Sequence, residues 1–449
     1  MPDSRGPAAD TWIAAAVFAA MFLVYNANGR EIGSYDSRPT ALAVRELILR
    51  GTLQLDVPVA ATPAYASRWG FISDQSGHYR SIYSPVPALI AAAIAWPAWK
   101  TGLVDVQAPL GPPLMAKVAA SICVALAVAV AYLTARRYLS RRLALLTAGA
   151  LGLGTGYWSS ASQTLWQSET ALLGLSLAVL LLGADSSRKG LVAGAAIGAA
   201  LALALTARPQ LAPTVLILLI GVAWRRPASA AIASTVVAAA VGALAMTNLR
   251  WFGHPMGALP LLTEVNAEIH ATGSTFAVWS DGYVGLLISP SRGLLVFSPI
   301  VLVAFAGVGA AFRRGLRNPE LWCVLAAAAQ FVLYGSYSVW WGGHTFGPRY
   351  MLDVLPVLVP PAALALSRVH SPTWGSIAEL ALAWSIVVAA TGAFCYPNDA
   401  WNTNPTDVDR DHARLWSVSD NQIERCWKAG LSPQNFRLMT RAAFRQPER

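Results

Sequence analysis

Charged residues are scarce in this sequence. Of its 449 residues only 12% are Asp, Glu, Lys or Arg, whereas 55% are hydrophobic. Soluble domains usually carry about 25% charged residues, so this chain has too few to cover a water-facing surface. The apolar residues also stand in long blocks, and about ten of these approach the roughly 20 residues that a helix needs to cross a bilayer. The sequence therefore predicts an all-α polytopic membrane protein.

Several motifs of catalytic and cofactor sites are also missing. The sequence contains no HExxH, no CxxC pair, no Walker loop and no GxSxG, so a hydrolase nucleophile or a nucleotide site has no support. Of the four cysteines, Cys123 and Cys323 fall inside apolar blocks and are expected to pack there. Cys395 and Cys426 stand near the C-terminus and could form a disulfide if that part of the chain faces an oxidising compartment. No cleavage site follows the first apolar block, which indicates an uncleaved first helix.

The net charge of +10 does not indicate nucleic-acid binding, because the basic residues form short clusters between apolar blocks. Eleven segments are predicted to span the membrane: residues 12–28, 116–135, 143–158, 165–184, 190–206, 210–224, 228–248, 294–312, 320–340, 350–367 and 374–396. A further block, Tyr83 to Leu103, contains Pro85, Pro87 and Pro97. It could span the membrane, lie at the interface or re-enter, since proline disfavours a straight helix.

The basic clusters decide the topology. They are Arg136-Arg137 with Arg141-Arg142, Arg188-Lys189, Arg225-Arg226, Arg313-Arg314 with Arg317, and Arg368. If Tyr83–Leu103 does not span, all of them fall on one side, which the positive-inside rule makes cytoplasmic. We therefore predict about eleven spans, with the N-terminus inside and the C-terminus outside.

Residues 1–396 then form one membrane domain, and residues 397–449 form a polar tail that is either a small cap or disordered. The first outer loop, residues 29–115, is expected to contain juxtamembrane or re-entrant helices. Within it, Arg38–Arg50 has apolar residues at helical spacing opposite basic ones, which is typical of a helix lying at the interface.

Two carboxylates stand at the predicted outer face. Asp36 follows the first span by some eight residues and could act as a general base towards a hydroxyl or amine. Alternatively, Asp36 or Ser37 begins the following helix as its N-cap. Glu169 lies near the outer end of the fourth span, where a carboxylate marks either a site or a side chain that reaches to the interface.

Three arginines also fall on this face. Arg208 occupies a tight turn, Arg292 follows Ser289-Pro290-Ser291, and Arg349 ends a Gly-rich stretch. Guanidinium groups bind phosphate bidentately, and glycine lets backbone amides approach an anion. The alternative for each arginine is an interfacial anchor that meets lipid headgroups.

These segments resemble the GT-C glycosyltransferases, and specifically their bacterial branch related to protein O-mannosyltransferases and lipid A aminoarabinose transferases. The matching stretches cover roughly residues 12–367. They are Tyr35-Asp36-Ser37-Arg38, Tyr83-Ser84-Pro85-Val86-Pro87, Leu165-Trp166-Gln167-Ser168-Glu169, Ser289-Pro290-Ser291-Arg292-Gly293 and the segment from Gly342 to Tyr350. The first loop has one Asp in place of the family's adjacent pair, and Pro-Val-Pro replaces its Pro-Pro pair. The tail is too short for a large acceptor-binding domain.

The resemblance implies an inverting transfer of a sugar from a polyprenyl-phosphate donor to a lipid, glycan or protein acceptor at the outer face of the cytoplasmic membrane. Asp36 would be the base, with Glu169 orienting acceptor or sugar. The donor phosphate would meet Arg208, Arg292, Arg349 and His344. Further substrate contacts are expected from Arg38, His78, Arg80, Tyr83 and Tyr350. No metal ligands are predicted, and a divalent cation is an open possibility.

Two other classes of function stay open. A transporter or flippase for a lipid-linked saccharide or another anionic amphiphile would use the same arginines to bind its cargo. Transporters usually place polar groups near the middle of the membrane, whereas here they gather at one surface, which favours an enzyme. A membrane scaffold without chemistry would leave Arg208, Arg292 and Arg349 unexplained.

Overall fold

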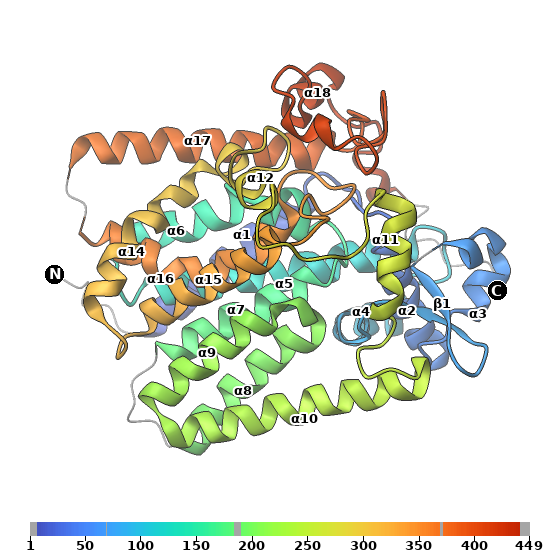
Figure 1. Ribbon diagram of the computed structural model, residues 1–449, viewed down its shortest axis with the longest axis horizontal. Coiled ribbons are helices and arrows are strands. Elements are labelled where there is room, and N and C mark those ends of the chain that lie inside the picture. Colours follow the sequence, from blue (N-terminus) through green and yellow to red (C-terminus); the bar gives the residue numbers. More distant parts are fainter. Residues whose placement is uncertain (1–6, 69, 184–189, 369–370, 441–449) are drawn as a thin grey trace.

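The computed structural model describes residues 7–68, 70–183, 190–368 and 371–440, and within these ranges it is a bundle of helices (Figure 1). The helices of the bundle are α1 (Pro7–Asn26), α5 (Gly111–Ala135), α6 (Arg141–Leu153), α7 (Ser168–Leu182), α8 (Gly190–Ala207), α9 (Ala212–Arg225), α10 (Pro227–Phe252), α14 (Leu302–Arg314), α15 (Pro319–Gly335), α16 (Leu355–Leu366) and α17 (Pro372–Cys395). Each of the eleven predicted segments overlaps one of them. The prediction of an all-α protein is thus confirmed.

Among the described residues, six helices are long and apolar enough to cross a membrane: Ala8–Asn26, Gly111–Ala135, Gly190–Ala207, Pro227–Phe252, Arg349–Leu366 and Pro372–Cys395. Val86–Lys100, Ser168–Leu182, Pro209–Arg225 and Pro319–Gly335 are apolar but shorter. The chain is therefore a membrane protein with about six clear spans, and the number eleven stays a prediction.

The predicted span over residues 294–312 is wrong as a single helix. The structure has α13 (Leu294–Phe297), a 3₁₀ turn η5 (Pro299–Val301) and then α14. Pro299 has no backbone N–H to donate and its ring clashes with the preceding turn, so a continuous helix cannot pass through it. The break places Ser298 beside the site described below.

Small residues allow the central helices to pack closely. Helix α5 lies near the centre of the bundle, and 78% of its apolar window is buried. Helix α10 lies at the outside, and only 17% of its apolar window is buried. A Cβ atom added at Gly198 of α8 would stand 2.8 Å from the backbone of Ala233 in α10, so glycine lets these two helices touch. The outer surface of α10 stays exposed and apolar, as a lipid-facing surface requires.

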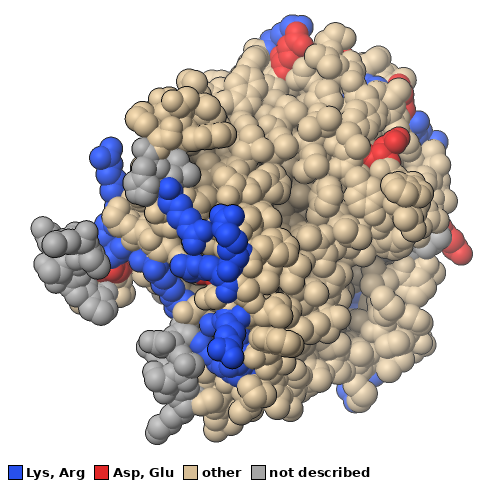
Figure 2. Space-filling view, turned by 60° about the vertical axis from the view of Figure 1, so that its left-hand side comes forward, with Lys and Arg blue, Asp and Glu red and all other residues tan. Residues whose placement is uncertain are grey.

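One end of the bundle is strongly basic. Asp10 near the start of α1 receives hydrogen bonds from Arg136 Nε at 3.1 Å and Arg141 Nε at 2.8 Å. Arg225 Nε donates to the carbonyl of Arg317 at 2.9 Å, which brings two further basic turns together. Figure 2 shows a large group of Lys and Arg side chains on one part of the surface, with only scattered charged side chains elsewhere in the view. The described part of the chain thus has the predicted basic turns at one end.

The opposite end holds the first loop (Figure 1). This loop contains α2 (Arg38–Arg50), α3 (Asp56–Ala61), the 3₁₀ helix η1 (Pro63–Ser67), an antiparallel hairpin of β1 (Phe71–Ser73) and β2 (Tyr79–Ser81), and α4 (Val86–Lys100). The predicted helix over residues 38–50 is confirmed. Helix α4 is seen end-on in Figure 1, across the direction of the long helices, and at 15 residues it is shorter than a span. The block from Tyr83 to Leu103 therefore does not run alongside the other helices.

The loop after α10 and the tail cover the same end. They contain η4 (Leu259–Leu261), α11 (Leu262–His270), α12 (Gly282–Ile288), η7 (His412–Trp416), α18 (Gln422–Ala429) and η8 (Arg437–Met439). The described tail is a folded cap with Trp401 fully buried in it. A disulfide joins Cys395 at the end of α17 to Cys426 in α18, so the pairing left open by the sequence is present.

Candidate functional site

Asp36 and Arg349 form an ion pair at the end of the bundle that carries the first loop. Asp36 lies in the turn before α2, and Arg349 begins the 3₁₀ helix η6 (Arg349–Val354). Arg349 Nη1 donates to Asp36 Oδ2 at 2.9 Å. The side chain of Ser37, at the N-cap position of α2, makes no capping bond but donates to the carbonyl of Ser34. Asp36 thus pairs with Arg349 and does not cap α2, and its catalytic role stays a prediction.

Arg349 is enclosed by an aromatic ring and a pocket. Its guanidinium carbon lies 4.7 Å from the centre of the Trp166 ring, a cation–π contact. Its Nε is buried and has no hydrogen-bond partner in the structure. A buried guanidinium N–H without an acceptor is costly, so an anionic ligand in this position would stabilise the site.

A small pocket lies beside Arg349. The hydroxyls of Thr155, Ser159, Ser160 and Ser298 belong to its polar lining. Its apolar lining is Gly156, Phe297, Phe346, Pro348, Leu352, Val388 and Ala389. Hydroxyl and guanidinium donors next to an apolar wall suit a phosphate that carries a hydrocarbon chain.

Tyr83 lies among the charges of this group. Burial raises the pKa of the Tyr83 hydroxyl well above its ordinary value, and the nearby charge of Asp36 raises this pKa further. The positive charges of Arg349 and Arg208 lower the pKa, but by less. Tyr83 therefore stays protonated and can donate a hydrogen bond. A second pocket is lined by Tyr83, Arg80 and Trp251, together with residues of α2 and α4.

Arg208 is buried and already has an anionic partner. Its Nε donates to Asp353 Oδ2 at 2.7 Å, and its Nη1 donates to Ser168 Oγ at 3.2 Å. Tyr334 also donates to Asp353 Oδ2. Arg208 is only 3% exposed, so it is not an anchor in lipid headgroups. Its predicted contact with the donor phosphate gains no support, because Asp353 neutralises it.

Glu169 does not reach to the interface as one interpretation of the sequence expected. It is fully buried in the first turn of α7, where the helix dipole favours a negative charge. Its Oε1 accepts a weak hydrogen bond from Thr170 Oγ1 at 3.4 Å, while Oε2 has no partner. The structure leaves Glu169 with one unused acceptor near Trp166, but its catalytic role stays a prediction.

Arg292 is buried and hydrogen-bonded to other parts of the protein. Its five N–H groups donate to the carbonyls of Trp341, Ser291 and Gly343 and to the side chains of Gln422 and Asn402, at 2.6–3.0 Å. No donor is left for a phosphate. The arginine ties the α12–α13 turn to the tail, so the predicted phosphate contact is not carried further.

His344 also turns to the tail. Its Nε2 lies 2.9 Å from Asp407 Oδ1 and 3.2 Å from Asp409 Oδ2. These carboxylates lie beyond the last predicted span, and nothing in the sequence near His344 indicates the contact. The structure thus places His344 in a second cluster, and its predicted contribution to phosphate binding gains no support.

The remaining predicted substrate residues are divided. Tyr350 stacks on Tyr334 with ring centres 4.8 Å apart and joins the group around Arg208. Arg80 Nε pairs with Asp74 Oδ2 at 2.6 Å, and His78 Nδ1 lies 2.9 Å from Asp56 Oδ2, so both hold the first loop together. Arg38 is exposed at the start of α2, and its role stays a prediction.

Three residues of this end escaped the sequence interpretation. Asp353 and Lys117 each fall inside a predicted span, and a charge in an apolar block is itself a signal of a site or a buried partner. Lys117 Nζ donates to Gln163 Oε1 at 2.5 Å. Trp166 stands in a stretch singled out for Glu169, but only its contact with Arg349 shows its importance.

The fold of this chain is similar to that of a solved structure. The chain is similar to ArnT from Cupriavidus metallidurans in the apo state, with a TM-score of 0.50 and 16% identity over 91% of this chain and 68% of that one. This likeness establishes the fold. The family resemblance in the sequence is confirmed at that level.

Two structures of the archaeal oligosaccharyltransferase from Archaeoglobus fulgidus show weaker similarity. The structure in complex with an inhibitory peptide and a dolichol-phosphate has a TM-score of 0.46 and 14% identity over 92% of this chain. The structure tethered with an acceptor peptide has a TM-score of 0.48 and 13% identity over 91% of this chain. The present chain spans 60% and 59% of their lengths. No family model matches the sequence, and no curated protein matches it.

Proposed function

We propose that this protein is an inverting glycosyltransferase that moves a sugar from a polyprenyl-phosphate donor to a hydroxyl or amine acceptor. The observation that carries the proposal is the Asp36–Arg349 pair beside a pocket lined by hydroxyls and apolar side chains. A carboxylate and an arginine at one pocket provide a base and a phosphate ligand. The fold shared with ArnT supports the same reaction class.

The reaction follows from these groups. Asp36 takes the proton of the acceptor O–H or N–H while the acceptor atom attacks the anomeric carbon. The bond from that carbon to the phosphate oxygen breaks with inversion, and the electron pair leaves on the polyprenyl phosphate. The ion pair with Arg349 engages Asp36 Oδ2, and a carboxylate has a second oxygen with which to accept the proton.

Arg349 stabilises the leaving group. Its buried Nε has no acceptor in the structure, and Arg349 is a lining residue of the pocket, so we assign this N–H to the leaving phosphate. A charge-assisted hydrogen bond of this kind grows stronger as charge develops on the phosphate in a water-poor site. Tyr83, which stays protonated, can donate to the sugar or the phosphate.

The proposal does not use a metal at Asp36. Every step is assigned to side chains. The acceptor and the sugar are left as classes. We place the reaction at the outer face of the cytoplasmic membrane, because the pair lies at the end of the bundle opposite the basic turns.

The test is transfer by the purified full-length chain from a panel of polyprenyl-phosphate sugars, with free polyprenyl phosphate as the readout. Wild-type protein should release it, and Asp36→Asn should lower the rate by about 10²-fold or more. Asp281→Asn is the matched control, since Asp281 is an exposed residue of the outer loop. Equal rates for wild type and Asp36→Asn would exclude Asp36 as the base. Movement of the intact donor across vesicles without release would identify a transporter.

A further inference from the structure

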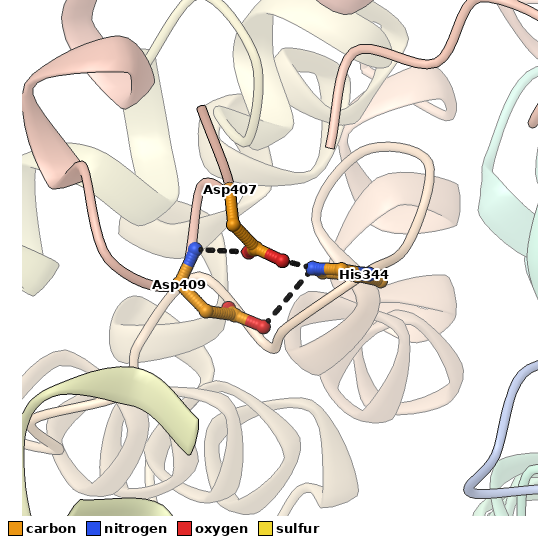
Figure 3. A group of neighbouring side chains, drawn as sticks. All are labelled: His344, Asp407 and Asp409. Carbon is orange, nitrogen blue, oxygen red and sulfur yellow. Dashed lines mark hydrogen bonds and ion pairs between the residues drawn. The ribbon is translucent and has the colours of Figure 1, made fainter. Parts of the chain in front are cut away.

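A second cluster of ligand-type side chains lies away from the Asp36–Arg349 pair. It consists of His344, Asp407 and Asp409, whose nearest donor atoms all lie within 4.8 Å of one another. Figure 3 shows the three side chains directed towards a common point, His344 from one loop and the two aspartates from the tail. Sixty-three residues separate His344 from Asp407, so only the folded tail brings them together.

The distances fit a metal centre. His344 Nε2 stands 2.9 Å from Asp407 Oδ1 and 3.2 Å from Asp409 Oδ2. Ligand atoms bound to Zn²⁺ at about 2.0–2.2 Å in a tetrahedron stand about 3.3 Å apart. His344 Nε2 therefore stands close to this spacing from each carboxylate oxygen, and all three atoms lie within 4.8 Å of one another.

The surroundings orient the carboxylates, as the outer shell of a metal site does. Trp341 Nε1 donates to Asp409 Oδ1 at 2.7 Å, which turns Oδ2 towards His344. The backbone N–H of Asp409 donates to Asp407 Oδ1 at 2.9 Å. Asp409 is only 4% exposed, so its charge is fixed in place and shielded from water.

His270 is a second histidine beside these carboxylates. Its Nδ1 lies 3.0 Å from Asp409 Oδ1. A ring nitrogen this close to a carboxylate oxygen requires a proton or a cation to offset their repulsion. Two carboxylates between two histidines carry a formal charge of −2 when both rings are neutral, and one divalent ion balances it.

We propose that His344 Nε2, Asp407 Oδ1 and Asp409 Oδ2 bind a divalent transition-metal ion, Zn²⁺ being the best match to one imidazole and two carboxylates. The ion joins the Gly-rich loop before Arg349 to the tail. With the Cys395–Cys426 disulfide, it forms a second link between the membrane helices and the cap. This site is independent of the proposed transfer reaction.

The competing arrangement is a protonated His344 between the two aspartates. Burial lowers the pKa of His344, but the hydrogen bonds and charges of Asp409 and Asp407 outweigh it and raise the pKa to about 9. A proton on His344 would then supply positive charge beside the two carboxylates in place of the ion. Metal analysis separates the two, because an imidazolium cannot bind Zn²⁺.

The experiment uses the full-length chain in detergent, stripped with a chelator and dialysed against Zn²⁺ alone. Elemental analysis should find one Zn²⁺ per chain, and a competition titration should show affinity at least about tenfold weaker in His344→Gln and in Asp409→Asn. The matched controls are His254→Gln, an exposed histidine, and Asp411→Asn, an aspartate of the same tail. Both should bind as the wild type does.

Two results would overturn the proposal. Wild-type chain that retains no Zn²⁺ after dialysis leaves the protonated His344 as the explanation, and this measurement needs no variant to fold. Zn²⁺ bound equally by His344→Gln, Asp409→Asn and the controls would place the ion elsewhere. Thermal unfolding adds a second readout, since Zn²⁺ should raise the melting temperature of the wild type but not of His344→Gln.

Discussion

Arg349 Nη1 lies 2.9 Å from Asp36 Oδ2, although 313 positions separate the two residues in the sequence. The contact joins the first loop to the segment between α15 and α16. It also faces a pocket whose hydroxyls and apolar side chains come from other segments again. Five parts of the chain thus meet where the proposed reaction takes place.

Replacing Arg349 tests its role in stabilising the leaving group. We expect Arg349→Gln to lower transfer by about 10²–10³-fold, because a lost donor to a developing anion costs that much in kcat. Arg349→Lys should recover only part, since lysine cannot bind Asp36 and a phosphate together as a planar guanidinium can. Arg410→Gln removes an exposed arginine of the same end as a control. Transfer that is unaffected by Arg349→Gln would contradict the role.

Asp353 and Arg208 should behave as a structural unit. Both are nearly inaccessible, with side chains 0% and 4% exposed. Asp353→Asn alone should destabilise the protein by about 3–5 kcal/mol, because it leaves Arg208 buried without its charge partner. Thermal unfolding in detergent measures this. The double variant Asp353→Asn with Arg208→Gln should be more stable than Asp353→Asn, and a purely additive loss would disprove the pairing.

The two ends of the bundle should label from opposite sides of the membrane. Val418→Cys places a thiol in the tail at a position 76% exposed, and we expect a membrane-impermeant maleimide to reach it in intact cells. Arg313→Cys, at the basic end, should react only after the membrane is opened. Positive charges are retained on the cytoplasmic side. The reverse pattern would overturn both the topology and the outer location of Asp36.

The disulfide between Cys395 and Cys426 should hold the cap. It closes a loop with a sequence separation of 31 residues, so replacing both cysteines by serine should cost about 3 kcal/mol. Limited proteolysis of the tail is the direct measurement, with cleavage expected at lower protease concentration in the double variant. Cys123→Ser with Cys323→Ser, which changes the free buried cysteines, is the control. Equal protection of the tail in all three proteins would mean that packing alone holds it.

Much of the architecture followed from local pattern. Apolar blocks predicted a helix in each of the eleven segments, and amphipathic spacing predicted α2 over residues 38–50. The break in the helix at Ser298-Pro299 was not predicted, because the whole segment is apolar and was interpreted as one span. Pro299 itself indicates such a break, since proline interrupts a helix. Helix lengths depend on such interruptions, so the number of true spans could not be read from apolar composition.

The candidate site was predictable in part. Asp36 and Arg349 were singled out separately, and the structure pairs them. Arg208 and Arg292 carried the same sequence signal as Arg349. In the structure, however, Arg208 pairs with Asp353, and Arg292 donates to five acceptors of the protein. A lone arginine at a turn indicates that an acceptor exists nearby. It does not say whether that acceptor is the protein or a ligand.

The sequence by itself determined that this is a helical membrane protein with basic turns at one end. Both features depend on local properties, because the length of an apolar run decides whether a helix can span the bilayer and the position of basic residues decides its orientation. Only the tertiary structure decided which polar groups are satisfied within the protein. Hydrogen bonds and ion pairs join residues far apart in the sequence: Asp36 and Arg349 are separated by 313 positions, and His344 and Asp407 by 63. Pairing of that kind is set by packing in three dimensions, and it separates the candidate site from its structural neighbours.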